Sequence, residues 1–206
     1  MKDMMFTIRI EVTQMTKPLF LFVGKSASGK TTTANILAEK HGYTQVESYT
    51  TRKPRFNNES GHIFVTEEEF NNLGELAAYT FYNDNHYGTT FEQLENSDIY
   101  VVDVPGVESL LEKLKNDKRS ICILYFKTSV YNRILRMIDR GDGDMMIISR
   151  LLQDEKDDWL KQLESLVWKY SNIFGKDVQL YNVNANGNLK NVLELVLYYM
   201  NRHKED

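Results

Sequence analysis

One stretch of the sequence has residue types at a spacing suited to binding phosphate. Residues 24–31, GKSASGKT, match the pattern G-x-x-x-x-G-K-[S/T] at every fixed position. Glycines let the backbone curl so that successive N–H groups point into one concavity, while Lys30 can reach phosphate oxygens and the Thr31 hydroxyl can ligate a magnesium ion. An ordinary glycine-rich turn is the alternative. The candidate nucleotide-binding residues are Gly24, Lys25, Ser26, Ala27, Ser28, Gly29, Lys30, Thr31 and Thr32.

The segments on both sides of this loop are of the kind that must hold it in place. Residues 19–23, LFLFV, form a continuous apolar run that predicts a buried strand. Residues 31–40 predict a helix, which Gly42 would end. A strand, a glycine-rich loop and a helix N-terminus together present backbone N–H groups to an anion. The context therefore favours a phosphate-binding loop (P-loop) over a simple turn.

An acidic residue, Asp103, follows a second predicted strand. Residues 99–102, IYVV, form a short apolar run typical of a parallel strand. Ligands of open parallel sheets bind outside the carboxyl ends of the strands, so we expect Asp103 to face the same crevice as the P-loop. There its carboxylate would help to hold the metal ion, directly or through water. The alternative is that Asp103 only caps the helix that follows it.

Arginines recur at helical spacing in the second half of the chain. Arg133, Arg136 and Arg140 fall at positions i, i+3 and i+7, which places them on one face of a predicted helix. Arg150 follows on a second predicted helix, after the flexible segment 141–144, GDGD. Converging guanidinium groups suit phosphate binding. The alternative is a solvated charged face on which nearby aspartates pair with the arginines.

Composition narrows the class of protein. The chain has 206 residues, of which 42% are hydrophobic and 26% charged, enough for one domain with a sizeable core. Its formal net charge of -4 argues against binding to duplex nucleic acid but leaves free nucleotides as partners. Apolar runs such as residues 121–126 are far shorter than the roughly 18 residues of a membrane helix. The only cysteine, Cys122, lies in that run, which predicts a buried, inert thiol and suits the cytoplasm.

Apolar strands that alternate with amphipathic helices predict an α/β fold. Further strands are expected over residues 44–48, 121–126 and 178–183, and further helices over 66–76, 154–174 and 189–200. Residues 81–90, rich in Asn and Asp, predict turns. The order of elements predicts a three-layer α/β/α P-loop kinase fold with a mostly parallel, five-stranded core sheet.

We expect one domain over residues 16–206, preceded by an N-terminal extension over 1–15 of unknown role. The extension alternates apolar and polar residues as an edge strand would, yet Met15 could equally begin the domain. Two polar insertions, at about residues 48–95 and about 131–155, would close over two phosphorylated substrates. The sequence leaves open whether the chain is a monomer or a homodimer.

Several blocks along residues 19–200 together resemble the guanylate kinase family. The P-loop is followed by SYTTRKPR, residues 48–55, which looks like the segment that binds the acceptor phosphate in that family. HYGTT, residues 86–90, is similar to the family's Tyr-Tyr-Gly-Thr, and Asp103 with Gly106 fits its Asp-x-x-Gly. The pairs Arg136 with Arg140-Gly141 and Arg150 with Leu151 resemble its lid pattern.

The resemblance implies an ATP-dependent nucleoside monophosphate kinase that transfers the γ-phosphoryl group to (d)GMP or a related nucleotide, with Mg²⁺ as cofactor. It implies catalytic roles for Lys30, Arg136, Arg140 and Arg150, and metal binding by Thr31 and Asp103. The acceptor-binding residues would be Ser48, Arg52, Arg55, Tyr87, Thr89 and Asp103. The alternatives are a kinase of the same fold with another acceptor, such as a ribose bisphosphate, and a non-catalytic guanylate-kinase-like binding domain.

Three departures from the family pattern bear on the acceptor. The position of the family's guanine-binding Glu, nine residues before Tyr87, is Ala78. A second phosphate-binding tyrosine is absent from the shortened segment GHIF, residues 61–64, where His62 is the nearest stand-in. Val101 replaces the first acid of Asp-x-Asp-x-x-Gly. These changes put the preference for guanine in doubt more than phosphoryl transfer itself.

Overall fold

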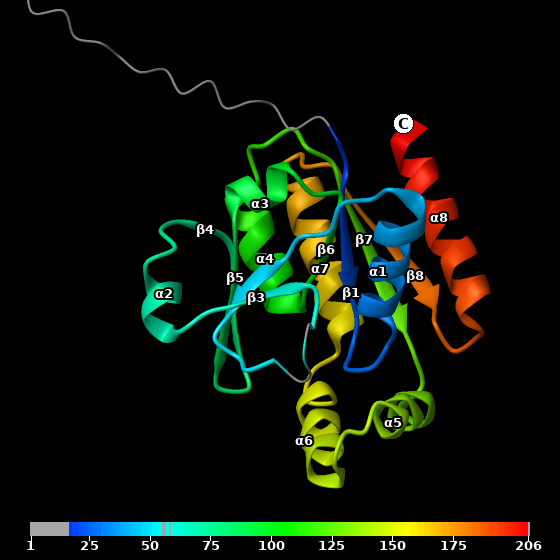
Figure 1. Ribbon diagram of the computed structural model, residues 1–206. Coiled ribbons are helices and arrows are strands. Elements are labelled where there is room, and N and C mark those ends of the chain that lie inside the picture. The colour runs from blue at the N-terminus through cyan, green and yellow to red at the C-terminus, as the bar shows by residue number, and fades with distance from the viewer. Residues whose placement is uncertain (1–16, 55–56, 58, 206) are drawn as a thin grey trace, which may run out of the picture.

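Four parallel strands form the central sheet of the computed structural model, which describes residues 17–54, 57 and 59–205 (Figure 1). In spatial order they are β6 (Ile99–Val101), β1 (Leu19–Val23), β7 (Ile121–Lys127) and β8 (Val178–Asn184). The register pairs Phe20 with Ile99 on one side of β1 and with Cys122 on the other. Because all four strands run in the same direction, their carboxyl ends lie at one edge, where such sheets bind ligands.

Helices cover both faces of this sheet, which makes three layers (Figure 1). The helices are α1 (Lys30–His41) and α8 (Leu189–Glu205) on one face, and α4 (Val104–Lys113) and α7 (Trp159–Asn172) on the other. Side chains alternate along a strand, so β1 supplies both cores. Leu19, Leu21 and Val23 pack under α4 and α7, while Phe20 and Phe22 pack under α1 and α8.

The predicted fold class is confirmed, with one difference in the sheet. The strand expected over residues 44–48 is reduced to a single parallel bridge between Gln45 and Ile99. The backbone N–H and the hydroxyl of Thr44 both donate to the Asp98 carboxylate, and from Ser48 onward the chain pairs in another sheet. The described core sheet therefore has four strands rather than five. Burial of Cys122 is confirmed and raises the pKa of its thiol to about 12.

A second, mixed sheet lies to the left of the core in Figure 1. Its strands, in spatial order, are β3 (His62–Phe64), β2 (Ser48–Thr50), β5 (Asn85–Thr90) and β4 (Leu76–Tyr82). Residues 81–90, predicted as turns, mostly belong to the β4–β5 hairpin. Only Asn83 and Asp84 form the turn, with φ angles of 52° and 57° that suit a two-residue hairpin loop.

Two short helices flank this sheet, α2 (Glu67–Asn71) and α3 (Phe91–Glu95). The spacing of Thr66 and Glu69 predicts a capping box at the start of α2, and this is confirmed, because the Thr66 hydroxyl accepts from the Glu69 N–H and the Glu69 carboxylate accepts from the Thr66 N–H. The helix is shorter than predicted. Gly74, with φ of 77°, turns the chain into β4, which begins at Leu76.

Helices α5 (Val130–Asp139) and α6 (Asp144–Asp154) project beyond the carboxyl edge of the core sheet (Figure 1). The sequence allowed either Thr128 or Ser129 to open α5, and the structure has Ser129 as the cap, since its hydroxyl accepts from the Asn132 N–H. The helix expected over residues 154–174 begins only at Trp159, because Asp154 ends α6 and Asp158 caps α7. None of the described helices is long and apolar enough to cross a membrane.

A buried ion pair ties the bases of α5 and α6 to the P-loop. The side chains of Arg133 in α5 and Asp154 in α6 are each 1% exposed, and the guanidinium lies 2.5 Å from the carboxylate. The same carboxylate accepts from the Ser26 N–H at 2.8 Å, and the Arg133 Nε–H donates to the Ser26 carbonyl at 2.9 Å. Two helices from the second half of the chain thus hold both main-chain polar groups of one P-loop residue.

We predict that Asp154→Ala lowers the free energy of unfolding by roughly 3 kcal/mol or more, because it leaves the Arg133 charge buried without its main partner. The double variant Arg133→Leu/Asp154→Leu should recover most of this loss, since it removes both buried charges. Glu155→Ala is the matched control. Its side chain is 48% exposed, so a loss under roughly 1 kcal/mol is expected. Denaturant unfolding measures all three, and a loss below roughly 1 kcal/mol for Asp154→Ala would contradict the buried pair.

Candidate nucleotide site

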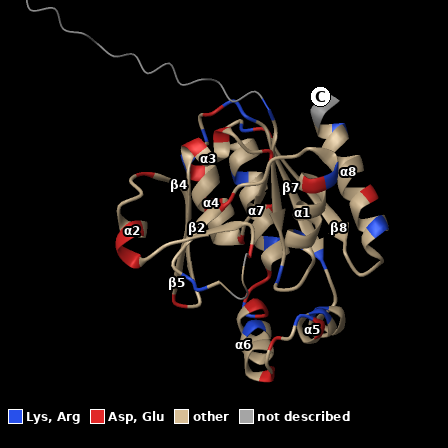
Figure 2. Cartoon of the chain, in the orientation of Figure 1, with Lys and Arg blue, Asp and Glu red and all other residues tan. Residues whose placement is uncertain are grey.

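A cavity of about 580 Å³ lies at the carboxyl edge of the core sheet, where the P-loop, the second sheet and α6 meet. It collects residues that are far apart in the sequence. The predicted site residues that line it are Gly24, Ser26, Ala27, Lys30, Thr31, Ser48, Arg52, Tyr87, Asp103, Arg140 and Arg150. Lys and Arg residues at this end of the molecule are accompanied by Asp and Glu residues (Figure 2).

The backbone of the P-loop has a conformation that its residue types explain. A Cβ atom at Gly24 would lie 2.8 Å from both the Phe126 carbonyl oxygen and the Ser28 hydroxyl, so only glycine fits. Gly29 has a φ of 101°, which other residues rarely adopt. Ala27 has a φ of 58°, and backbone strain of this kind concentrates at functional sites. Close packing and the conformational freedom of its glycines therefore fix the shape of the loop before any ligand binds.

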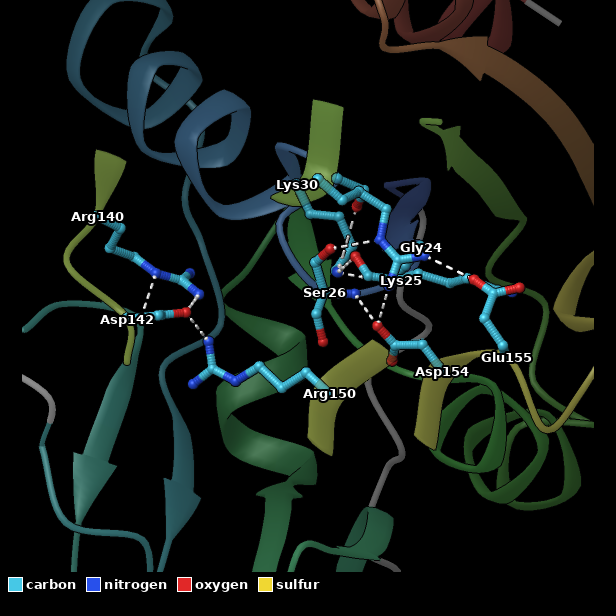
Figure 3. Close-up of polar contacts among 11 residues, drawn as sticks. Gly24, Lys25, Ser26, Lys30, Arg140, Asp142, Arg150, Asp154 and Glu155 are labelled. Carbon is cyan, nitrogen blue, oxygen red and sulfur yellow. Dashed lines mark hydrogen bonds and ion pairs between the residues drawn. The ribbon is translucent and has the colours of Figure 1, made fainter. Parts of the chain in front are cut away.

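The N-terminus of α1 is open toward the cavity. No side chain caps it, since its N-cap residue is Gly29, and no acidic residue lies in its first turn. Its first N–H groups and its partial positive charge are therefore suited to an anion. Lys30, the first helical residue, donates to the carbonyls of Gly24 and of Lys25, the latter at 3.2 Å (Figure 3). Thr31 follows on the cavity wall.

Asp103 both caps a helix and lines the cavity, the two roles that the sequence left open. It caps α4, because its Oδ1 accepts from the Gly106 N–H at 2.9 Å, and it lines the cavity. Its Oδ2 accepts from the Thr80 hydroxyl at 3.2 Å. Burial raises the pKa of this carboxyl group, while the Gly106 N–H, the Thr80 hydroxyl and the charge of Lys30 oppose the rise. The cap thus fixes one carboxylate oxygen, and the other is bonded to Thr80, which also lines the cavity.

The donor set fits magnesium bound through nucleotide phosphates. Thr31 supplies a hydroxyl oxygen and Asp103 a carboxylate oxygen, and both line the cavity. Hard oxygen ligands of this kind suit Mg²⁺, which usually takes only one or two protein ligands and completes its shell with phosphates and water. No cluster of three or more His, Cys, Asp or Glu side chains occurs among the described residues, so an all-protein metal cage is not formed there.

Two of the predicted arginines face the cavity and share one carboxylate. Asp142 accepts from Arg140 Nε at 3.1 Å and from Arg150 Nη1 at 2.5 Å, and it also contacts Arg140 Nη2 (Figure 3). Burial lowers the pKa of Arg150, and the Asp142 charge opposes this change. From the sequence, Asp142 was one of the nearby aspartates that could pair with these arginines on a solvated helix face. In the structure its side chain is 8% exposed and fixes the spacing of the two guanidinium groups.

Arg133 and Arg136 do not line the cavity, although they share a helical face with Arg140. Arg136 donates to the P-loop carbonyls of Ala27 and Ser28 at 3.3 and 3.1 Å, and to Ala185 at 2.7 Å. Burial lowers the pKa of Arg136. Its donors thus hold the main chain of the loop from outside, and the catalytic role predicted for it stays a prediction that this geometry does not support.

The predicted acceptor residues are divided between the cavity and its surroundings. Arg52 forms a bidentate pair with Glu59, at 2.9 and 3.1 Å, and Tyr87 lines the wall. The Ser48 hydroxyl lies 2.9 Å from His62 Nδ1, and both residues line the cavity. Thr89 is fully buried and donates to Gln93 at 2.9 Å, outside the lining residues.

Other predicted residues lie next to the cavity or outside the described chain. Lys25 pairs with Glu155 at 2.9 Å, and Ser28 is buried beneath the loop. Thr32 is exposed on α1. Arg55 lies outside the described residues, as do residues 1–15 of the predicted extension.

The two acids close to Ala78 in the sequence, Glu75 and Asp84, do not take the place of the family's glutamate in the cavity. Ala78 is fully buried in the core cluster under α4 and α7. Glu75 is exposed and pairs with Lys113 at 2.7 Å, while Asp84 is in the hairpin turn. Neither acid lines the cavity. Asp103 and Asp154 are the acidic side chains among its described lining residues.

Thr80 and Tyr82 line the cavity although the sequence did not single them out. Both are on β4, at alternate positions that face the same way. The signal that could have found them is the Asn83-Asp84 pair, which marks a tight hairpin and so makes the preceding residues a strand. In the β4–β5 hairpin Thr80 pairs with Tyr87, and both residues line the cavity together with Tyr82.

The chain is similar in sequence to curated guanylate kinases. The enzyme of Bacteroides thetaiotaomicron is 30% identical over 154 residues, which cover 69% of this chain and 76% of that protein. The enzyme of Fusobacterium nucleatum is 28% identical over 160 residues, 71% of this chain and 81% of that protein. The enzyme of Mycoplasma pneumoniae is 31% identical over 153 residues, 68% of this chain and 63% of that protein. No profile of a known protein family matches the chain.

The fold is also similar to that of a solved guanylate kinase. The crystal structure of guanylate kinase from Anaplasma phagocytophilum superposes with a TM-score of 0.53 at 14% identity, covering 93% of this chain and 88% of that chain. This likeness supports the fold, while the sequence relatives support the family. The P-loop, the three-layer core and the sequence similarity lead to the same conclusion: this chain belongs to the guanylate kinase family of nucleoside monophosphate kinases.

Proposed function

We propose that the protein transfers the γ-phosphoryl group of ATP to the phosphate of a nucleoside monophosphate, with GMP and dGMP as the leading acceptors. One observation carries the proposal. A single cavity has the P-loop with Lys30 on one wall and Arg52 with Tyr87 on another, and Arg140 and Arg150 of the α5–α6 region complete its lining. The relatives named guanylate kinase support this substrate pair.

The reaction needs charge stabilisation and positioning but no general base. An oxygen of the acceptor phosphate, already anionic, forms a bond to the γ-phosphorus as the bond from that phosphorus to the β–γ bridging oxygen breaks, and ADP leaves with the electron pair. Lys30, Arg140 and Arg150 would neutralise charge on the phosphoryl oxygens. Arg52 and Tyr87 would hold the acceptor phosphate. Mg²⁺, when held by Thr31 and Asp103, would supply further neutralisation of the phosphates.

The carboxylates that pair with these arginines set their starting positions. Asp142 holds Arg140 and Arg150, and Glu59 holds Arg52. A guanidinium group has five N–H donors, so these contacts leave further donors for a phosphate. A carboxylate partner also spaces two guanidinium groups that would otherwise repel each other. The arrangement favours recognition of phosphate by arginines already close to their working geometry.

The Lys30 ammonium is central to this proposal. We predict that Lys30→Ala abolishes turnover while the melting temperature changes little, since the side chain donates to carbonyls of the loop and would act mainly on bound phosphate. Lys40→Ala, exposed at the other end of α1, is the matched control and should keep native activity. Turnover of ATP with each nucleoside monophosphate and thermal unfolding measure the two effects. Unchanged turnover in Lys30→Ala, or no turnover in the native chain, would remove the kinase proposal.

Arg140 and Arg150 are predicted to act in the transition state. Replacing either by alanine should lower kcat by roughly 10²- to 10³-fold with little change in the KM for ATP. Arg202→Ala, exposed on α8, is the control and should leave both constants unchanged. Steady-state kinetics separate the cases. A variant that raises only KM would show that its arginine binds the ground state instead.

The acceptor preference follows from the absence of an acid at position 78. A carboxylate that accepts from guanine N–H donors forms charge-assisted bonds worth roughly 1.5–3 kcal/mol each, so its loss corresponds to roughly 10- to 100-fold weaker discrimination. We therefore predict that this protein prefers guanine less strictly than family members that have a glutamate at this position. The measurement is kcat/KM for GMP, dGMP, AMP, CMP, UMP and dTMP. A guanine preference beyond roughly a thousandfold would mean that other residues read the base.

A further inference from the structure

The hydroxyl of Tyr82 is a polar group that the roles assigned so far do not use. Tyr82 is the last residue of β4 and lines the cavity together with the P-loop residue Ser26. Its Oη atom is buried and has no hydrogen bond of regular geometry among the described residues, although the Ser26 hydroxyl lies close enough to affect its pKa. A buried hydroxyl that lacks a well-formed hydrogen bond destabilises the protein relative to one that is fully bonded. Native proteins retain such groups mainly where a ligand or water satisfies them.

The neighbours of this hydroxyl come from both halves of the proposed site. Burial raises the pKa of Tyr82, and the Asp154 carboxylate adds to the rise. A weak hydrogen-bonding interaction with the Ser26 hydroxyl and the charge of Arg150 oppose the rise in pKa, while Tyr87 adds a smaller increase. These groups belong to the P-loop, to α6 and to the proposed acceptor wall. Tyr82 therefore lies where the donor and acceptor sides of the cavity meet, and it remains protonated, able to donate a hydrogen bond.

We propose that Tyr82 is a further catalytic residue, whose hydroxyl donates a hydrogen bond to an oxygen of the phosphoryl group during its transfer between the two nucleotides. The inference rests on the proposed function. Tyr82 gives up no proton: the bond to the bridging oxygen breaks, the bond to the acceptor oxygen forms, and the phenol only stabilises negative charge on an equatorial oxygen. The contact strengthens as charge develops, so its effect should appear in kcat.

The matched pair of variants is Tyr82→Phe and Tyr79→Phe, which remove the same atom from the same strand. Tyr79 is on the opposite face of β4, is 41% exposed, and its hydroxyl contacts His86 at 2.9 Å rather than the cavity. Phenylalanine keeps the ring of Tyr82 in place. Thermal unfolding should therefore show both variants folded like the native chain.

Steady-state kinetics with ATP, Mg²⁺ and the best acceptor nucleotide is the first measurement. Tyr82→Phe should lower kcat roughly 10- to 100-fold while both KM values change less than about threefold. Tyr79→Phe should stay within about twofold of the native chain. If kcat of Tyr82→Phe is within about twofold of native, or if only a KM rises, the proposal is overturned.

Calorimetric binding gives a readout besides turnover. Tyr82→Phe should bind ADP and the acceptor nucleotide separately with native affinity, yet bind the complex of ADP, aluminium fluoride and acceptor, a mimic of the phosphoryl group in flight, roughly 10- to 100-fold more weakly. Equal weakening of all three ligands would overturn a transition-state role. An inactive native chain would overturn the proposed function, and Tyr82's role with it, whereas an active native chain with an unaffected Tyr82→Phe overturns only the role of Tyr82.

Discussion

The close packing of the P-loop is the constraint on which the rest of the site depends. Gly24 lies against the β7 backbone at Phe126, with no room for a Cβ atom. Further along the loop, Arg133, Arg136 and Asp154 bind its main chain from outside. A loop held on both sides needs little reorganisation when an anion arrives, and preorganised dipoles are the most effective ones. The helices that supply these contacts also carry Arg140 and Arg150, so the same interactions place the cavity's cations.

Electrostatic balance explains how so many charges coexist at this edge of the sheet. Arg133 is neutralised by Asp154, Arg52 by Glu59, and Arg140 with Arg150 by Asp142. These ion pairs differ in solvent exposure, and the exposure decides whether an arginine can exchange its carboxylate partner for a phosphate. The Arg133 pair is buried and structural, whereas Arg140 is one-third exposed and can change partners at lower desolvation cost. Burial thus divides arginines of one helical face into those that build the loop and those that can bind phosphate.

Local sequence pattern predicted the features that short-range physics determines. The β1–loop–α1 unit, the strand before Asp103 and the capped starts of α2 and α5 follow from apolar runs, glycines and capping residues. Helical spacing placed Arg133 and Arg136 beside Arg140 but could not reveal that their partners are P-loop carbonyls, because that depends on tertiary packing. The hairpin was missed because Asn83 and Asp84 were read as part of a long turn. The sequence allowed the Tyr hydroxyls of this segment to bind a ligand, but without the strand it could not place Tyr82 on the cavity wall.

Position 78 also affects how this chain can change over evolutionary time. Ala78 lies among buried apolar residues, so a glutamate gained there would place a carboxylate in the core. A single substitution would then cost stability before any new contact to a base could favour it. A polar partner or a rearrangement of β4 would have to come first, which is a form of epistasis. The packing around one methyl group therefore limits which substitutions this position can accept without other changes nearby.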